Sequence, residues 1–295
     1  MSLRGAVAVV GVAESDLGEV GPGLTPLDLI GQATLRALED AGLEKSDVDG
    51  LFSASAYYHM PTLSVGEYLG IRPRYSDATN VGGSSFVSHL LHAAAAIDAG
   101  LCEVALITYA STQRSGGGRL VSGSEALPYE APYRPRYPVS MYALAASRHM
   151  YQYGTTREQL AEVAVAAREW AKLNPKAFVR DDLSIEDVLE SRMVSSPLSV
   201  LDCCLVTDGG GAVLVTSGER ARELRKPPVY LLGAGEAHWH RNISQMPDLT
   251  ASAAAESGPR AYRMAKLGPE DVDVAMLYDA FTINTVLFLE DLGFC

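Results

Sequence analysis

The bulk properties of this chain exclude several classes of protein. Its 295 residues, 47% of them hydrophobic, suffice for two domains or for one large α/β unit with a sizeable core. The formal net charge of −12 argues against a nucleic-acid binder, because neutralising phosphates needs a basic face. No apolar run approaches the roughly 18 residues that span a membrane, and the four cysteines show neither metal-ligand spacing nor a disulfide framework. We therefore expect a cytoplasmic protein with reduced thiols that binds neither membrane nor nucleic acid.

The first hundred residues alternate between predicted strands and helices. A valine-rich run at 6–12 predicts a buried strand, which is followed by an amphipathic helix ending near Ala41 and a strand at 50–54. The stretch DATNVGGSSF at 77–86 then precedes an alanine-rich run, Gly100 and an apolar run at 104–109, which predicts a turn, a buried helix at 87–99, a glycine cap and a strand. Such a turn gathers backbone N–H groups and the positive end of a helix dipole, which suits an anionic oxygen. The turn holds no cysteine, and Ser84 and Ser85 would need a base to act as nucleophiles.

The middle of the chain has a different composition. Residues 112–142 are rich in Gly, Pro, Arg and Tyr, which predicts a long, locally ordered loop. Helices are predicted at 140–153 and 155–173, the second capped by Thr155 or Thr156, and Ser184 with Asp187 has the spacing of a capping box. A strand at 211–216 returns to the core. We therefore expect an N-terminal half at 1–111 and 205–227, an inserted loop region at 112–204 and a C-terminal half at 228–295.

An internal repeat relates the two halves. The runs ALEDA at 37–41 and DVD at 47–49 have counterparts 224 positions later in AYRMA at 261–265 and DVD at 271–273. In both copies an amphipathic helix leads into an apolar strand, at 50–54 and 274–278, and a valine-rich strand precedes each copy, at 6–12 and 229–232. With this offset Cys295 corresponds to Ile71, so the second copy stops before the counterpart of the glycine turn. We expect a pseudo-twofold α/β protein whose second half is incomplete.

Several runs carry a specific resemblance. The duplicated halves, the glycine turn and the long inserted region, together with LDCCLVTDGGGAVL at 201–214, HMYQYGTTREQL at 149–160 and LYDAFT at 277–282, resemble the thiolase superfamily. Its most similar branch is the sterol-carrier-protein thiolase and lipid-transfer-protein group. The resemblance covers essentially the whole chain. It implies an α/β thiolase-like fold with duplicated halves, mixed five-stranded sheets and buried helices, and it implies a homodimer.

The chain departs from the family pattern in two places. Gly83 stands where thiolases carry the cysteine that accepts the acyl group, and the regions of the family's histidine and second reactive cysteine have no counterpart in this sequence. Cysteine-less members of the branch include retro-aldolases, which have tyrosine and aspartate where thiolases carry an Asn-Glu-Ala-Phe motif. The matching positions here are Tyr278 and Asp279. The resemblance therefore implies cleavage of a β-hydroxyacyl-CoA, such as a degraded steroid side chain, without an acyl-enzyme.

Each candidate site residue has a structural alternative. Tyr278 is a candidate catalytic base or acid, or a tyrosine that packs at a strand end. Asp279 is a candidate for orienting Tyr278, or the N-cap of a helix at 281–292. Gly82, Gly83 and Ser84 are candidates for substrate binding through space and backbone N–H groups, and glycines in a tight turn fit the same pattern.

The basic and imidazole side chains leave further alternatives. Arginines of the inserted loop, Arg114 first among them, could bind coenzyme A phosphates as implied by the resemblance, or could pair with nearby glutamates. His240 could border the substrate pocket or lie on the surface at a strand end. His89 and His92 are three apart on a helix, but their apolar surroundings favour core histidines over metal ligands, and we expect no metal.

Three functional hypotheses follow. The favoured one is retro-aldol cleavage of a β-hydroxyacyl-CoA, with coenzyme A present only as part of the substrate and no tightly bound cofactor. The second is acetyl-CoA C-acyltransferase activity, which would need a nucleophile other than residue 83. The third is a non-catalytic acyl-CoA-binding or lipid-transfer subunit. Because some cysteine-less relatives work with an OB-fold acyl-CoA-binding protein, a partner of that kind is also expected.

Overall fold

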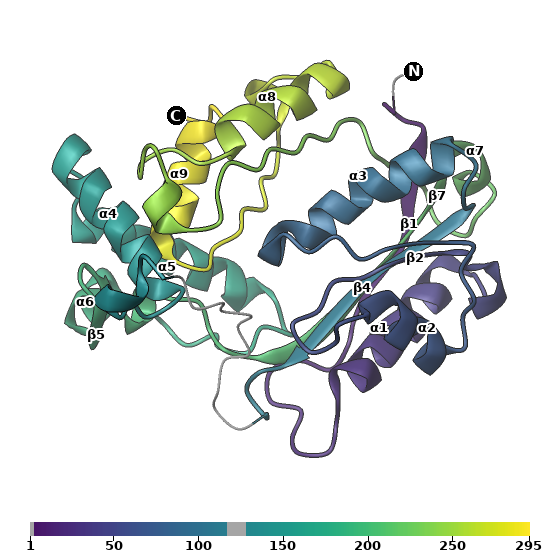
Figure 1. The fold of residues 1–295 in the computed structure, drawn as a ribbon, viewed down its shortest axis with the longest axis horizontal. Helices are drawn as coiled ribbons and strands as arrows, with labels where there is room; N and C mark the ends of the chain where they lie inside the picture. The colour runs from purple at the N-terminus through teal and green to yellow at the C-terminus, as the bar shows by residue number, and fades with distance from the viewer. Residues whose placement is uncertain (1–2, 117–127) are drawn as a thin grey trace. The chain divides into compact units, whose positions relative to one another are not determined.

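The chain forms two units, each with its own core. The structure is a computed structural model that describes residues 3–116 and 128–295 (Figure 1). The first unit comprises Met1–Gly123, Val206–Ala234 and Arg263–Lys266, and the second comprises Ser124–Leu205, Gly235–Tyr262 and Leu267–Cys295. Within the described ranges, no helix combines the length and the apolar character that crossing a membrane requires.

A mixed sheet of six strands is the centre of the first unit. Its order is β3-β2-β4-β7-β1-β8. The strands are β1 (Val7–Glu14), β2 (Gly50–Phe52), β3 (Tyr75–Asp77), β4 (Val104–Thr112), β7 (Asp208–Ser217) and β8 (Val229–Tyr230). β2 pairs in parallel with β3 and β4, whereas β7 pairs antiparallel with both β4 and β1. The expected α/β architecture is confirmed, with one strand more than the five predicted.

The additional strand is β8, at the edge of the sheet. The sequence predicted a strand at 229–232 that would open the second half. In the structure this segment pairs antiparallel with β1, with Ala8 opposite Tyr230 and Val9 opposite Val229. A strand forms wherever it finds a free hydrogen-bonding edge, and local sequence does not specify which edge that is.

Helices cover both faces of the six-stranded sheet. α1 (Pro26–Ala41) and α2 (Pro61–Leu69) lie on one face, and α3 (Ser85–Asp98) lies on the other (Figure 1). Successive side chains of a strand point to opposite faces of the sheet, so Leu106 belongs to the core on the α1 side and Ile107 to the core on the α3 side. α3 is buried on its sheet-facing side only, because Val87 is exposed. The fully buried helix expected there is therefore wrong for its outer face.

The internal repeat is confirmed in the backbone geometry. α1 ends at Gly42 with φ +72°, and its counterpart α8 (Ala254–Ala265) is followed by Lys266 with φ +57°. The same capping hydrogen bonds recur, from Leu43 N to Leu38 O at 2.9 Å and from Leu267 N to Tyr262 O at 3.2 Å. Short 3₁₀ turns follow in both copies, at Lys45–Asp47 and Pro269–Asp271. The local conformation is thus duplicated where the sequence indicated.

One residue is missing from the later part of the second copy. α2 ends in a hydrogen bond from Ile71 N to Gly66 O, and α9 (Thr282–Asp291) ends in the same bond from Phe294 N to Leu289 O, both at 2.9 Å. Ile71 therefore corresponds to Phe294, and the predicted match of Ile71 with Cys295 is wrong by one position. A gap of one residue is invisible to a comparison at constant offset.

The second unit is mainly helical. It contains α4 (Val139–Tyr153), α5 (Arg157–Leu173), α6 (Ile185–Glu190) and α9, the hairpin of β5 (Met193–Ser195) and β6 (Leu198–Ser199), and most of α8. Residues of α4, α5, β6 and α9 share one apolar core. Thr156 is the N-cap of α5, one of the two predicted candidates, and Ser184 forms its predicted capping box with Asp187. Thr156 also forms a capping box, with Gln159, which was not predicted.

The strand predicted at 274–278 is not formed. Residues 274–278 pair with no strand in the described part of the chain, and the side chains of Val274 and Met276 are 72% and 92% exposed. His240, for which a place at a strand end was one alternative, also lies in a loop, in a stretch where the sequence alternates from His238 to His240 as in a strand. Both segments have apolar or alternating sequences, but a strand needs a hydrogen-bonded neighbour as well.

Candidate functional site

The glycine turn is exposed to solvent, and the buried side chain of Ser85 fixes its conformation. Gly82–Ser84 forms a 3₁₀ turn between β3 and α3, in which Gly82 has φ +85° and all three residues are exposed. The Ser85 hydroxyl fixes the turn by donating to Gly82 O at 2.6 Å and accepting from Val81 N at 2.9 Å. The Ser85 hydroxyl therefore has a structural role, because it is already hydrogen-bonded within the turn. At Gly83 the turn presents backbone only.

Two histidines of α3 support the residues that lead into the turn. His89 Nε2 lies 3.0 Å from Thr79 O, and His92 Nδ1 lies 2.6 Å from Asp77 Oδ2. Burial by itself would raise the pKa of Asp77, but hydrogen bonds from Thr79 and His92 outweigh it and place the pKa below its usual range. The histidines thus brace the turn, and the described residues contain no group of three metal-ligating side chains.

Arg114 is engaged by groups of its own unit. Its Nε donates to Glu19 Oε2 at 2.8 Å, and its backbone N donates to Asp208 Oδ1 at 2.8 Å. The ion pair is exposed, so it is screened by water and leaves the guanidinium accessible to a competing phosphate. Of the other loop arginines, Arg119 lies outside the described residues.

Tyr278 and Asp279 lie in an irregular segment directly before α9. The side chain of Tyr278 is 56% exposed. The backbone next to it is held by Cys204 N, which donates to Ala280 O at 2.9 Å, and by a bridge between Cys203 and Phe281. The N-cap of α9 is Phe281, which makes no side-chain cap. The alternative of Asp279 as N-cap is therefore wrong, because the helix begins at Thr282, one residue later than the predicted start at 281.

Side chains around this segment complete a polar cluster in the second unit. The ring of Tyr142 stacks on Phe281 with centroids 4.5 Å apart. Burial raises the pKa of Tyr142, partly offset by a hydrogen bond with Asn284, and burial together with the Asp279 carboxylate raises the pKa of Cys204. The sequence gives no local signal for Tyr142 or Asn284, because Tyr142 meets Phe281 from a distant part of the chain.

His240 is also in the second unit. Burial lowers its pKa, and its Nδ1 is buried without a hydrogen-bond partner among the described residues. The predicted site residues therefore fall into two groups, Gly82, Gly83, Ser84 and Arg114 in the first unit and His240, Tyr278 and Asp279 in the second. The structure joins Gly82–Ser84 in one turn and Tyr278 with Asp279 in one segment. Their combination into a single site stays a prediction.

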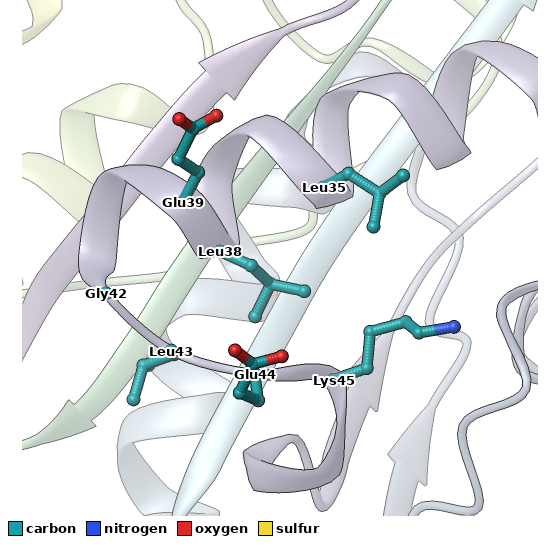
Figure 2. A pocket seen from close by; sticks show the side chains of 7 residues that line it. All are labelled: Leu35, Leu38, Glu39, Gly42, Leu43, Glu44 and Lys45. Carbon is teal, nitrogen blue, oxygen red and sulfur yellow. The ribbon is translucent and has the colours of Figure 1, made fainter.

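A separate hollow lies at the end of α1. It has a volume of about 440 Å³ and is lined by apolar side chains with a charged rim, namely Leu35, Leu38, Glu39, Gly42, Leu43, Glu44 and Lys45 (Figure 2). None of the predicted site residues lines it. We therefore do not connect it with the chemistry of Tyr278.

Comparison with known proteins gives a consistent result. The family described as "Thiolase C-terminal domain-like" matches residues 235–295. A "Steroid side-chain-cleaving aldolase" of Thermomonospora curvata is 33% identical, with 99% of this chain and 79% of that protein covered. An "Acetyl-CoA acetyltransferase" of Methanothermobacter thermautotrophicus is 34% identical, with 98% of this chain and 77% of that protein covered.

A solved structure extends the likeness to three dimensions. The structure described as "Ltp2-ChsH2(DUF35) aldolase" matches with a TM-score of 0.91 at 34% identity, covering 99% of this chain and 78% of that one. The mixed sheet between helical layers and the glycine turn at the head of α3 define a thiolase-fold protein. The chain belongs to the thiolase superfamily, in its sterol-carrier-protein thiolase and lipid-transfer-protein branch, and is an enzyme of that superfamily.

Proposed function

We propose that this protein cleaves a β-hydroxyacyl-CoA by a retro-aldol reaction. The observation that carries the proposal is the exposed turn at Gly82–Ser84, which leaves open space at Gly82 and has no thiol at position 83. The Gly82 N–H donates to Asn80 Oδ1 at 3.2 Å. The name of the Thermomonospora relative, an aldolase that cleaves steroid side chains, agrees with this chemistry and suggests a steroid or lipid side chain as the acyl group. Coenzyme A takes part only as a portion of the substrate.

The proposed reaction needs a proton acceptor and an enolate stabiliser. A base removes the proton of the β-hydroxyl, the Cα–Cβ bond breaks as the carbonyl of the first product forms, and the electron pair becomes a thioester enolate that is protonated at Cα. Tyr278 is the proposed proton-transfer residue, with Asp279 beside it. A free tyrosine has a pKa of about 10, so Tyr278 needs a lowered pKa to act as base and acts as a hydrogen-bond donor otherwise.

The acetyl-CoA C-acyltransferase hypothesis rests on the similarity to the Methanothermobacter protein. That chemistry needs a thiolate to carry the acyl group. Burial raises the pKa of Cys102 and of Cys203 to about 11, and the pKa of Cys204 is raised as well. These thiols are poor nucleophiles at neutral pH, which favours the retro-aldol proposal.

We extend the proposal to partners. The solved relative is named as an assembly with ChsH2(DUF35), so an OB-fold acyl-CoA-binding protein is the partner we expect here, alongside pairing of two copies of this chain. The assay below therefore includes a candidate partner. A binding or lipid-transfer subunit would bind acyl-CoA without turnover in either condition.

The test is incubation with a β-hydroxyacyl-CoA that bears a bulky tertiary alcohol, with and without the partner, read by mass spectrometry. We expect a ketone and a shortened acyl-CoA, with activity lower by about 100-fold or more in Tyr278→Phe, since general acid–base groups contribute on that order. Tyr153→Phe is the matched control, because that tyrosine is in the same unit and similarly exposed, 59% against 56%. Intact substrate in every condition, or a covalent acyl-enzyme, would contradict the proposal.

A further inference from the structure

The segment that carries Tyr278 is anchored at its end by a buried carboxylate. Thr282, the first residue of α9, donates its hydroxyl to Asp202 Oδ1 at 3.0 Å. The other oxygen, Asp202 Oδ2, accepts from the backbone N and the hydroxyl of Ser199, at 2.7 and 2.8 Å. Asp202 is 3% exposed. One carboxylate therefore joins the start of α9 to the turn at Val200–Asp202 that precedes the two cysteines.

The same two stretches of chain are in contact at the next residues. Cys203 forms its bridge with Phe281, and Cys204 N donates to Ala280 O at 2.9 Å. The residues from 202 to 204 thus run alongside those from 280 to 282, with the Thr282 hydroxyl closing one end of this contact. Tyr278 and Asp279 project from the other end. A shift of Thr282 would be transmitted to them along a short backbone segment without regular structure.

The strength of this anchor comes from its charge and burial. A hydrogen bond to an ionised, desolvated acceptor is about twice as strong as a neutral one. Arg157 Nη2 lies 3.7 Å from Asp202 Oδ2 and supplies the opposite charge that lets the carboxylate stay buried. Asp202 is therefore a fixed acceptor, and the hydroxyl of Thr282 joins α9 to this carboxylate through a hydrogen bond.

We propose that Thr282 and Asp202 are positioning residues, which hold the segment of Tyr278 and Asp279 in the geometry that carbon–carbon cleavage requires. This inference rests on the proposed function, because it assigns the segment's geometry a role in that reaction. Neither residue touches the reacting atoms in the proposal. The side chains act through the backbone at 280–282.

The experiment replaces the hydroxyl of Thr282 and keeps the volume. In Thr282→Val we expect kcat to fall about 10- to 100-fold, because a misplacement of about 1 Å at a reacting group can cost that much. KM should stay within about twofold, since a positioning defect acts on the transition state more than on substrate binding. Thr282→Ser retains the hydroxyl and should restore kcat to within about threefold of the wild type.

A second readout does not depend on activity. Amide hydrogen exchange at residues 278–281 should become about 3- to 10-fold faster in Thr282→Val and stay unchanged in Thr282→Ser. Thr250→Val is the matched control, because Thr250 is also a buried threonine of the second unit whose hydroxyl donates to an aspartate, Asp248, at 2.7 Å. Where Thr282→Val does not fold, Thr282→Ala removes the same hydroxyl with less bulk.

The outcomes separate the two proposals. With a wild type that cleaves the substrate, one contrary result is an unchanged kcat in Thr282→Val, and another is a kcat that falls as much in Thr282→Ser and Thr250→Val as in Thr282→Val. Either result overturns the positioning role and leaves the proposed function standing. If the wild type cleaves no substrate, with or without the partner, the proposed function is overturned. The catalytic role of Thr282 and Asp202 is then overturned as well, even if amide hydrogen exchange at 278–281 is faster in Thr282→Val and unchanged in Thr282→Ser. Loss of kcat with retained KM and rescue by serine supports both.

Discussion

At the scale of single residues, buried carboxylates organise both units. Asp202 does so at the start of α9 in the second unit, and Asp208 does so in the first unit, where it accepts hydrogen bonds from Val20 N, Arg114 N and both donors of Ser115. Such carboxylates are stabilising only while they are ionised and fully hydrogen-bonded. The contribution of Asp208 should therefore depend on pH.

For Asp208 the sign of that dependence follows from its pKa. Burial alone would raise the pKa, but the hydrogen bonds outweigh burial and hold the pKa below its usual range. The stabilisation is therefore present above the unfolded-state pKa of about 3.9 and is lost as the pH falls through the lower folded-state pKa.

We expect Asp208→Asn to lower the free energy of unfolding at pH 7 by about 1–3 kcal/mol, the usual cost of unsatisfied groups around a buried charge. The difference from the wild type should shrink as the pH falls below about 3.9. Denaturant unfolding at several pH values measures both, with the exposed Asp98→Asn as control. A difference that is constant between pH 7 and pH 2.5 would be inconsistent with an ionised Asp208 in the folded state.

At the scale of elements, the repeat shows how one backbone conformation is encoded in two ways. The left-handed residue after the helix is glycine in the first copy and lysine in the second, Gly42 and Lys266. Glycine adopts this conformation without a steric penalty, whereas other residues pay about 1–2 kcal/mol. The two copies should therefore respond to substitution with opposite signs.

Gly42→Ala should destabilise the chain by about 1 kcal/mol, because an added Cβ has room beside Arg225 and the penalty is conformational. Lys266→Gly should stabilise the chain by up to about 1 kcal/mol. The relief of the left-handed backbone conformation is the favourable part, and the greater conformational entropy of glycine in the unfolded chain offsets some of it. Thermal or denaturant unfolding of both variants decides the matter. Equal signs for the two changes would show that the caps are not equivalent.

The element scale also shows what could be predicted from sequence. The glycine turn, the helix after it, the N-cap at Thr156 and the capping box of Ser184 follow from local patterns, and the structure has them where they were expected. The pairing of β8 with β1 and the missing strand at 274–278 depend on which edges are free, which is a property of the whole sheet. The contact of Thr282 with Asp202 joins residues far apart in sequence, and no spacing rule marks it.

At the scale of the whole molecule, the exposed apolar side chains of residues 274–278 are the main liability. Val274 and Met276 belong to a run with high strand propensity that has no paired neighbour in the described chain. Segments of that kind promote association through their edges and apolar surface. We therefore expect the isolated chain to self-associate, or to become well behaved only with a partner.

Sedimentation velocity tests this expectation. Replacing Val274 and Met276 together by lysine should reduce association without a change in the unfolding midpoint, because both side chains are exposed. Leu173→Lys, which removes an exposed apolar side chain from α5, is the control. A wild-type chain that sediments as a single monomeric species over a range of concentrations would rule the idea out.

The position of β1 in the sheet has a consequence for the order of events during synthesis. Both neighbours of β1 are encoded late, since Val7 lies opposite Ser217 and Val9 opposite Val229. β1 must therefore wait for about 200 further residues before either neighbour is made, which at about 5–20 residues per second is on the order of 10–40 s. Until then, of the strands in this sheet, only the parallel strands β2, β3 and β4 can pair, and β1 is an unpaired apolar strand that a chaperone would recognise.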